Sequence, residues 1–188
     1  MLAVTAVTNT GLSVLNGDVG VVTPDTITGF PPGTTTGVIR NGGAAVVQAQ
    51  ADLTTAYDNA DHRTPSTEFA GDLNGKVFHA GVHHTSAALA LTGTVTLDGE
   101  NNPDAVFVFQ VDAAMNTAAL STVSLINGAQ ASNVYWQVEG AVVTGASSSL
   151  SGTVLADGGV SLGQAAQLSG RALSRGTVLL ETNLVTTG

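Results

Sequence analysis

The sequence contains no cysteine and very few basic residues, and both shortages limit what the protein can be. The missing cysteine removes the usual sequence evidence for a redox compartment. Five lysine and arginine residues stand against 14 aspartate and glutamate residues, so the formal net charge is −9. The basic residues are scattered along the chain, as Arg40, Arg63, Lys76, Arg171 and Arg175. Because no basic patch is available to neutralise a run of phosphates, we expect no nucleic-acid partner.

Charged and aromatic side chains are scarce as well. Charged residues make up 10% of the chain and aromatic residues 4%, whereas about 25% charged residues is usual in soluble domains. The polar surface must therefore consist mainly of Thr, Ser, Asn, Gln and Gly. With 188 residues, 43% of them hydrophobic, we expect a single domain, residues 1–188, with a sizeable core.

Long hydrophobic runs are also missing, and none approaches the roughly 20 residues that a membrane-spanning helix needs. We therefore expect no membrane insertion. Residues 1–7 are too few to form a signal peptide, and they include no basic residue. Two alternatives stay open at this point: the protein is exported by a signal that lies outside these 188 residues, or it is cytoplasmic.

What the sequence does contain is an internal repeat. Residues 150–156 match residues 168–174 at an offset of 18 residues, and Gly158, Val160 and Leu162 recur at the same offset as Gly176, Val178 and Leu180. Each unit holds about three short alternating runs, which predicts three strands per coil and a β-solenoid of triangular cross-section. An all-β sandwich, the alternative, would not predict a fixed period. Residues 10–17 resemble one side of such a coil but precede the other coils by a long interval, so we expect a solenoid that is discontinuous in sequence.

One α-helix is predicted at about residues 44–60. Its apolar residues recur at helical spacing, namely Val46, Ala49, Leu53, Ala56, Tyr57 and Ala60. This stripe needs an apolar partner. Residues 105–109, 134–138 and 154–156 lack polar alternation, as strands covered on both sides do. We therefore expect the helix to pack alongside the solenoid on these strands.

The alternating runs also predict one face of short hydroxyl side chains. If Val14, Val95, Val123, Leu150 and Leu168 point into the core, their neighbours point outward on one shared face. The first outward column is then Ser13, Thr94, Thr122, Ser149 and Gln167, and the second is Leu15, Thr96, Ser124, Ser151 and Ser169. Eight of these ten positions are Ser or Thr, and none is charged.

A flat, regular array of methyl and hydroxyl groups suits a periodic solid ligand, because the methyl groups favour ordered water and the hydroxyl groups can anchor it. A second interpretation stays open: threonine is common in strands, and any solvated sheet is polar outside. That interpretation does not explain why these columns lack Lys, Arg, Asp and Glu.

Other chemistry is weakly indicated. His79, His83 and His84 could contribute to a zinc site, but no cysteine or well-spaced carboxylate completes the ligand set, so we expect a solvated loop or coil edge. A polysaccharide-active solenoid enzyme would need a carboxylate pair on one face. The acidic residues instead fall near predicted turns and strand ends, at Asp98, Glu100, Asp104, Asp112, Asp157 and Glu181. An adhesion or carbohydrate-binding module, the remaining alternative, usually presents exposed aromatic rings, whereas Tyr135 and Trp136 are predicted to be buried.

Several ordered segments resemble one protein family. They are residues 9–11, 16–21 and 28–33 near the start, 49–57 in the helix, and 70–73, 97–99, 102–110, 126–131, 133–138 and 170–173 in the remainder. Together they cover most of the chain. On these segments the sequence resembles the DUF3494 family of ice-binding proteins from bacteria, algae and fungi.

The resemblance implies a mostly β fold, namely a discontinuous right-handed β-solenoid of triangular cross-section with one long α-helix alongside. It also implies binding to ice crystals, thermal hysteresis and inhibition of ice recrystallisation by a secreted, monomeric protein without catalytic residues, metal or cofactor. The family often marks its ice-binding face with Thr-Ala/Gly-x-Thr/Asn. Residues 10–13 match this motif closely, whereas residues 146–149 and 164–167 depart from it, so we expect moderate activity. The candidate ice-binding residues are Thr10, Ser13, Thr94, Thr96, Thr122, Ser124, Ser147, Ser149, Ser151, Gln167 and Ser169.

Overall fold

The computed structural model describes all 188 residues and is built almost entirely from short parallel strands. The strands are β1 Leu2–Ala3, β2 Ala6–Thr10, β3 Val14–Leu15, β4 Val19–Val21, β5 Ile27–Thr28, β6 Thr34–Thr35, β7 Ile39–Asn41, β8 Thr67–Glu68, β9 Val77–Phe78, β10 Gly81–Thr85, β11 Leu89–Leu91, β12 Thr94–Asp98, β13 Phe107–Val111, β14 Met115–Thr117, β15 Thr122–Ile126, β16 Val134–Val138, β17 Val142–Thr144, β18 Ser149–Ala156, β19 Val160–Leu162, β20 Gln167–Ser174, β21 Thr177–Glu181 and β22 Leu184–Thr186. One α-helix, α1 Ala44–Asp61, and one short 3₁₀ helix, η1 Ala131–Asn133, complete the chain.

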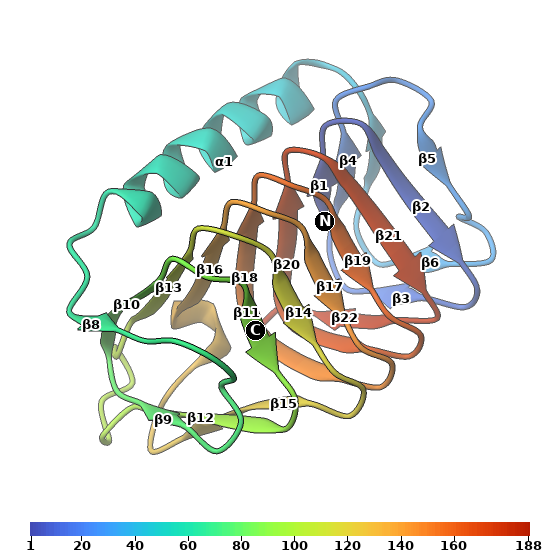
Figure 1. Cartoon of the computed structure of the whole chain (residues 1–188). Coiled ribbons are helices and arrows are strands. Elements are labelled where there is room, and N and C mark those ends of the chain that lie inside the picture. Colours follow the sequence, from blue (N-terminus) through green and yellow to red (C-terminus); the bar gives the residue numbers. More distant parts are fainter.

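The strands wind into stacked coils with three sides, which confirms the predicted β-solenoid (Figure 1). The first side is a seven-stranded sheet in the order β11-β14-β17-β19-β21-β2-β5. The second carries α1 and contains β8, β10, β13, β16, β1, β4 and β7 with the C-terminal halves of β18 and β20. The third contains β9, β12, β15, β22, β3 and β6 with the N-terminal halves of those two strands.

The repeat of 18 residues appears directly in the pairing of β18 with β20. All eight residues of Ser149–Ala156 pair in order with Gln167–Ser174. Both strands turn the corner between two sides at a glycine with positive φ, Gly152 at 120° and Gly170 at 148°. A Cβ atom on Gly170 would collide with the carbonyl oxygen of Gly152, so this corner requires glycine.

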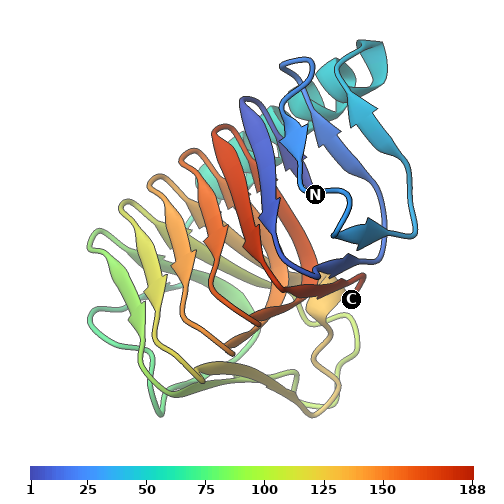
Figure 2. The same cartoon turned by 90° about the vertical axis from the view of Figure 1, so that its right-hand side faces the viewer.

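The stacking order of the coils differs from the order of the sequence, as predicted for a discontinuous solenoid. The first coil packs on the last one: β1 pairs with β20, β2 with β21 and β3 with β22. Figure 2 shows the blue N-terminal strands beside the red C-terminal ones. The helix α1 then carries the chain along the solenoid to its opposite end, where β8 begins the run of consecutive coils.

The helix is held by an apolar contact layer and by a polar contact at its end. Val46, Leu53, Tyr57 and Ala60 are buried in one cluster with side chains of the second side, namely Leu2, Val108 and Leu155. The side-chain amide of Gln110 donates hydrogen bonds to the carbonyl oxygens of Ala60 and Asp61, at 2.7 and 2.9 Å. The predicted docking of the helix on the apolar strands is therefore confirmed. Because the helix covers it, much of the second side is closed to a large flat ligand.

Candidate functional site

The third side presents one continuous row of uncharged, mostly short side chains, which we call the first column. In register across seven strands from β12 to β6 it contains Thr94, Thr122, Ser149, Gln167, Leu184, Val14 and Thr34. The next residue of each strand points inward; Val95, Val123, Leu150 and Leu168 are all buried. Neighbouring strands lie about 4.8 Å apart, so the column repeats at that interval.

A second column lies two residues further along each strand, and it is interrupted. Thr96 pairs with Ser124, and Ser151 pairs with Ser169, which pairs with Thr186. Between these two groups β15 and β18 pair only at Thr122 and Ser149. The helix η1 packs against β18 and β20 beside this gap, and Ser151 is only 8% exposed. The expectation of two continuous columns is therefore wrong for the second one. We call the first column and the exposed parts of the second the hydroxyl face.

The N-terminal coil corrects the expected alignment by one residue. Val14 was expected inside, yet it is 47% exposed and stands in the first column, while Leu15 is 1% exposed and points inward. Ser13 is fully buried, and its hydroxyl oxygen accepts a hydrogen bond from the backbone N–H of Asn183 at 2.9 Å. A shift of one residue exchanges the two faces of a strand. Ser13 is consequently part of a coil corner and does not reach the hydroxyl face.

Two further candidate residues lie elsewhere. Thr10 belongs to β2 in the seven-stranded sheet, where it pairs with Glu181 and its hydroxyl donates to the carbonyl oxygen of Leu180 at 3.2 Å. Ser147 occupies the turn before β18 with φ of 54°. Neither side chain stands in a column. The structure thus brings together eight of the eleven candidates, namely Thr94, Thr96, Thr122, Ser124, Ser149, Ser151, Gln167 and Ser169.

The turns before the face repeat one backbone conformation. Leu120, Ser147, Ala165 and Thr182 all have φ between 54° and 62°, although none is glycine. Their backbones are linked from coil to coil: the N–H of Leu120 donates to Ala146, that of Ser147 to Gln164, and that of Ala165 to Glu181. These stacked turns give the edge of the hydroxyl face a regular outline.

Sequence reasoning missed the members of the face supplied by the terminal coils. Leu184, Val14 and Thr34 extend the first column, and Thr186 extends the second. The short alternating run at residues 184–186 was a local signal for a further strand. Nothing local indicates that β3 stacks on β22, because that contact joins the two ends of the chain.

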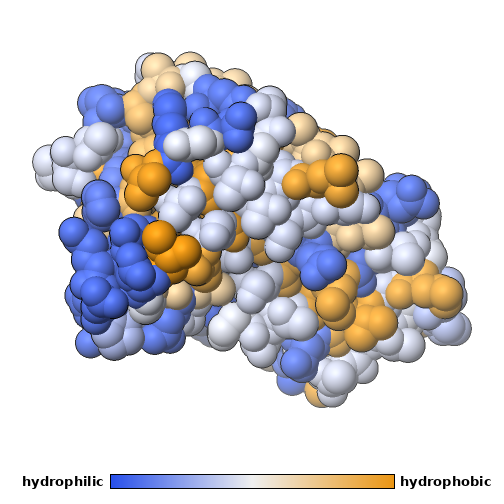
Figure 3. All heavy atoms as spheres, turned by 90° about the horizontal axis from the view of Figure 1, so that it is seen from below, coloured by the Kyte–Doolittle hydropathy of each residue, from blue (hydrophilic) through white to orange (hydrophobic).

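The hydroxyl face has no charged side chain in either column. Seen from below, its surface consists largely of pale residues of intermediate hydropathy, with separate hydrophobic and hydrophilic patches (Figure 3). Within the first column the exposed apolar residues are Val14 and Leu184. Asp98, the last residue of β12 and partly exposed, follows Thr96 by two residues and so lies outside both columns.

The histidines form no metal centre in the structure. His84 lies between two carboxylates, with its Nδ1 atom 2.7 Å from Glu68 and its Nε2 atom 3.1 Å from Asp112. Hydrogen bonding to Glu68, and then to Asp112, raises the pKa of His84 above its ordinary value. His83 is buried, and burial lowers its pKa. No group of three histidine, cysteine or acidic side chains is close enough to hold a metal ion.

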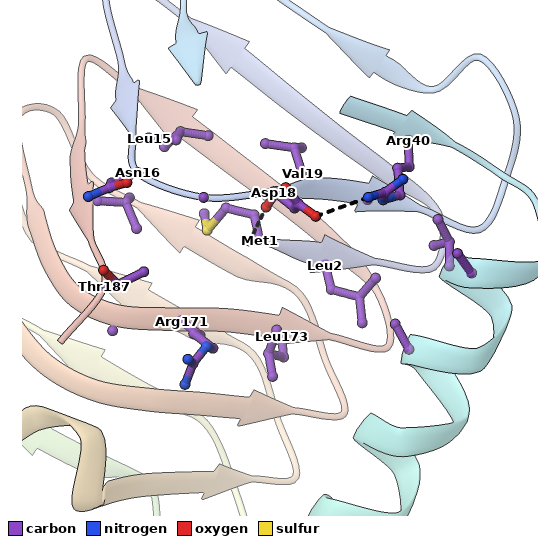
Figure 4. A pocket seen from close by; sticks show the side chains of 17 residues that line it. Met1, Leu2, Leu15, Asn16, Asp18, Val19, Arg40, Arg171, Leu173 and Thr187 are labelled. Carbon is purple, nitrogen blue, oxygen red and sulfur yellow. Dashed lines mark hydrogen bonds and ion pairs between the residues drawn. The ribbon is translucent and has the colours of Figure 1, made fainter. Parts of the chain in front are cut away.

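A hollow of about 380 Å³ opens at the N-terminal coil, between the start of α1 and β20 (Figure 4). Leu2, Val19 and Leu173 are among its apolar lining, and Asp18 and Arg40 form an ion pair of 3.4 Å at its edge. This hollow lies beside the helix and contributes nothing to the first column. No helix in the structure combines the length and apolar character needed to cross a membrane.

Comparisons with known proteins agree on one family. The family model described as Ice-binding-like matches residues 1–186. An ice-binding protein of Nostoc sp. (strain HG1) is 37% identical over 157 residues, which cover 83% of this chain and 58% of the relative. An ice-binding protein of Flavobacterium frigoris is 31% identical, with 99% of this chain and 72% of the relative covered.

Solved structures give the same result for the fold. The crystal structure of an ice-binding protein from the Antarctic ascomycete Antarctomyces psychrotrophicus superposes with a TM-score of 0.97 at 36% identity, covering 100% of this chain and 93% of that one. The DUF3494 domain of Shewanella frigidimarina ice-binding protein 1 superposes with a TM-score of 0.90 at 29% identity, covering 100% of this chain and 93% of that one. Some relatives are longer: the match spans 58% of the Nostoc protein and 21% of the full Shewanella protein.

Proposed function

This chain belongs to the ice-binding-like protein family, and on that premise we propose that it adsorbs to ice crystals through the hydroxyl face. The observation that carries the proposal is the first column, in which seven strands present uncharged side chains in strict register. Six steps of about 4.8 Å make this array roughly 29 Å long. A periodic array of this kind suits a periodic ligand.

The chemistry of adsorption follows from many weak, pre-set contacts. The methyl groups of Thr94 and Thr122 favour ordered water, and the neighbouring hydroxyl groups hold that water by hydrogen bonds. Each such bond contributes only about 1 kcal/mol net. The solenoid fixes the backbone of every strand before binding, so little further ordering is needed when ice is bound. The small free energies of the individual contacts therefore add up. Adsorbed protein then obstructs crystal growth, which gives thermal hysteresis and inhibits recrystallisation.

Three members of the first column that are neither Ser nor Thr limit the expected strength of this activity. Gln167 is long and flexible, so it must be ordered before it can match a lattice. Leu184 and Val14 supply apolar contact without a hydroxyl group. We therefore propose moderate thermal hysteresis. The surface needs no cofactor or catalytic residue, and we propose a monomeric, extracellular, non-enzymatic protein.

Two substitutions of equal size test which face binds ice. Ser149→Tyr places a large ring in the middle of the first column, whereas Ser161→Tyr places the same ring on the seven-stranded sheet, where Ser161 pairs with Val143 and Leu179. We expect Ser149→Tyr to lose most of the thermal hysteresis measured in a nanolitre osmometer, and Ser161→Tyr to retain it. Circular dichroism establishes that both variants are folded.

The opposite result, with activity lost only in Ser161→Tyr, would assign ice binding to the seven-stranded sheet. A wild-type protein that leaves growing ice crystals unshaped and lets frozen grains coarsen would refute ice binding altogether.

A further inference from the structure

An open groove runs beside the C-terminal half of α1 on the second side of the solenoid. Its volume is about 460 Å³, which lies within the usual range of roughly 300–1,000 Å³ for small-molecule sites. Val106, Val108, Tyr135, Leu155 and Leu173 provide an apolar lining. Tyr135 was expected to be buried but is partly exposed here. The helix thus leaves Val106, Tyr135 and Leu173 at least partly exposed along the groove, whereas Val108 and Leu155 are buried.

Two arginines, Arg63 and Arg171, line this groove. Every arginine ion pair in the structure involves Arg40 or Arg175, so Arg63 and Arg171 have no carboxylate partner. No acidic residue lines the groove. Figure 4 shows Arg171 on β20, apart from the pair of Asp18 and Arg40, with no interaction drawn to it. In a chain with a net charge of −9, two unpaired cations beside one apolar surface form a locally basic site.

The position of Arg171 places its charge at the end of a row of outward residues. Tyr135 pairs with Thr153, and Thr153 pairs with Arg171, so the three side chains follow one another across β16, β18 and β20. An extended ligand lying across these strands would meet the ring of Tyr135 first and the guanidinium of Arg171 last. Arg63 approaches the same groove from the segment after α1.

We propose that this groove binds a free amphiphile with one carboxylate group and a medium-length alkyl chain. The planar guanidinium group binds a carboxylate through two parallel hydrogen bonds, which suits this head group. The alkyl chain would cover Val106, Tyr135 and Leu173, which are at least partly exposed, and so remove apolar surface from water. The groove belongs to the second side of the solenoid, so this binding is independent of ice adsorption.

The probe for the test is decanoate, titrated below its critical micelle concentration into ¹⁵N-labelled protein at low salt. We expect saturable shifts in the amide resonances of Tyr135, Thr153 and Leu173. Arg171→Gln should weaken decanoate binding about tenfold, since a hydrogen bond to a charged group is lost. Arg63→Gln should also weaken it, because a second positive charge that lines the groove is removed. Lys76→Gln removes a positive charge from the distant end coil and should leave the affinity unchanged.

A second probe and a further variant serve as controls. Decanol, which has the same chain without the carboxylate, should bind much more weakly than decanoate. If Arg171→Gln does not fold, Val106→Glu places a repelling carboxylate on an exposed position of the groove and should abolish the shifts. Absence of saturable shifts, equal binding of decanol, or equal affinity in the arginine variants would each overturn the proposal.

Discussion

Thr122 and Ser149 are the single pair of residues through which β15 joins β18. Beyond this pair the two strands separate, and the second column has no partner for Ser124 on β18. The segment with η1 packs against β18 beside this gap, and Gly188 at the C-terminus approaches Ala131 of η1. The hydroxyl face is consequently continuous along its first column and divided along its second. Tests of ice binding are best aimed at the first column.

Gln167→Thr should increase thermal hysteresis. Gln167 lies between Ser149 and Leu184 in the first column, and it is exposed. A threonine there would present a methyl and a hydroxyl group with fewer rotamers to order. Nanolitre osmometry at equal protein concentration measures the effect. Equal or lower thermal hysteresis in the folded variant would show that ice binding is not limited by the side chain at this position.

Leu53→Asp should destabilise the whole protein. Leu53 is buried between α1 and the second side of the solenoid. The substitution removes an apolar side chain and buries a carboxylate without a partner, which costs about 4 kcal/mol or more. Val47→Asp, on the exposed side of the same helix, is the matched control and should change the free energy of unfolding by about 0.5 kcal/mol or less. Thermal unfolding followed by circular dichroism compares them, and similar melting temperatures for the two variants would contradict the docking of the helix.

Gly170→Ala should be more harmful than Gly75→Ala. Both glycines have positive φ, 148° and 75°, so an alanine is strained at either position, by roughly 1 kcal/mol or more. At Gly170 the new methyl group also meets the carbonyl oxygen of Gly152, whereas nothing lies within 4 Å at Gly75. Denaturant unfolding should therefore show a clearly larger loss of stability for Gly170→Ala. Equal losses would mean that strain alone determines the effect.

The end of the solenoid that begins with β8 should become less stable as the pH rises. His84 bridges Glu68 of the end strand β8 and Asp112 after β13, and its pKa is raised by these carboxylates, Glu68 contributing most. A raised pKa in the folded state means that the protonated bridge is fully present below the unfolded pKa of about 6.5. This stabilisation is lost as the pH rises through the higher folded pKa.

Amide hydrogen exchange measures this effect at Phe69, whose N–H donates to the carbonyl oxygen of His84 at 2.9 Å. After correction for intrinsic exchange, protection at Phe69 should fall between mildly acidic and mildly alkaline pH. In His84→Gln the protection should be lower at acidic pH and nearly independent of pH. A wild-type protein without this pH dependence would show that the bridge does not hold the end coil.

Much of the fold could be predicted from the sequence because its strongest signals are local. The match of residues 150–156 with 168–174 predicted the register that β18 and β20 adopt. The apolar stripe of the helix and the strands without polar alternation predicted their mutual packing, which Leu53, Val108 and Leu155 make. Local resemblance to DUF3494 ice-binding proteins agreed with the family model over residues 1–186.

The candidate site was only partly predictable. For Thr94, Thr122, Ser149 and Gln167 the alternation of inward and outward residues was sufficient, because the period of two is a property of each strand alone. It failed in the N-terminal coil, where Val14 takes the outward position and Ser13 is buried. Sequence patterns identify strands but do not state where a corner ends.

By itself, the sequence determined that the chain coils into parallel strands, that its core is apolar, and that the positions of the first column are uncharged. The tertiary structure decided which coils are neighbours, and so placed Val14 beside Leu184 in the first column. It also decided where the second column breaks, beside η1. The physical reason is that strand alternation depends on adjacent residues, whereas stacking depends on backbone hydrogen bonds between residues far apart in the chain.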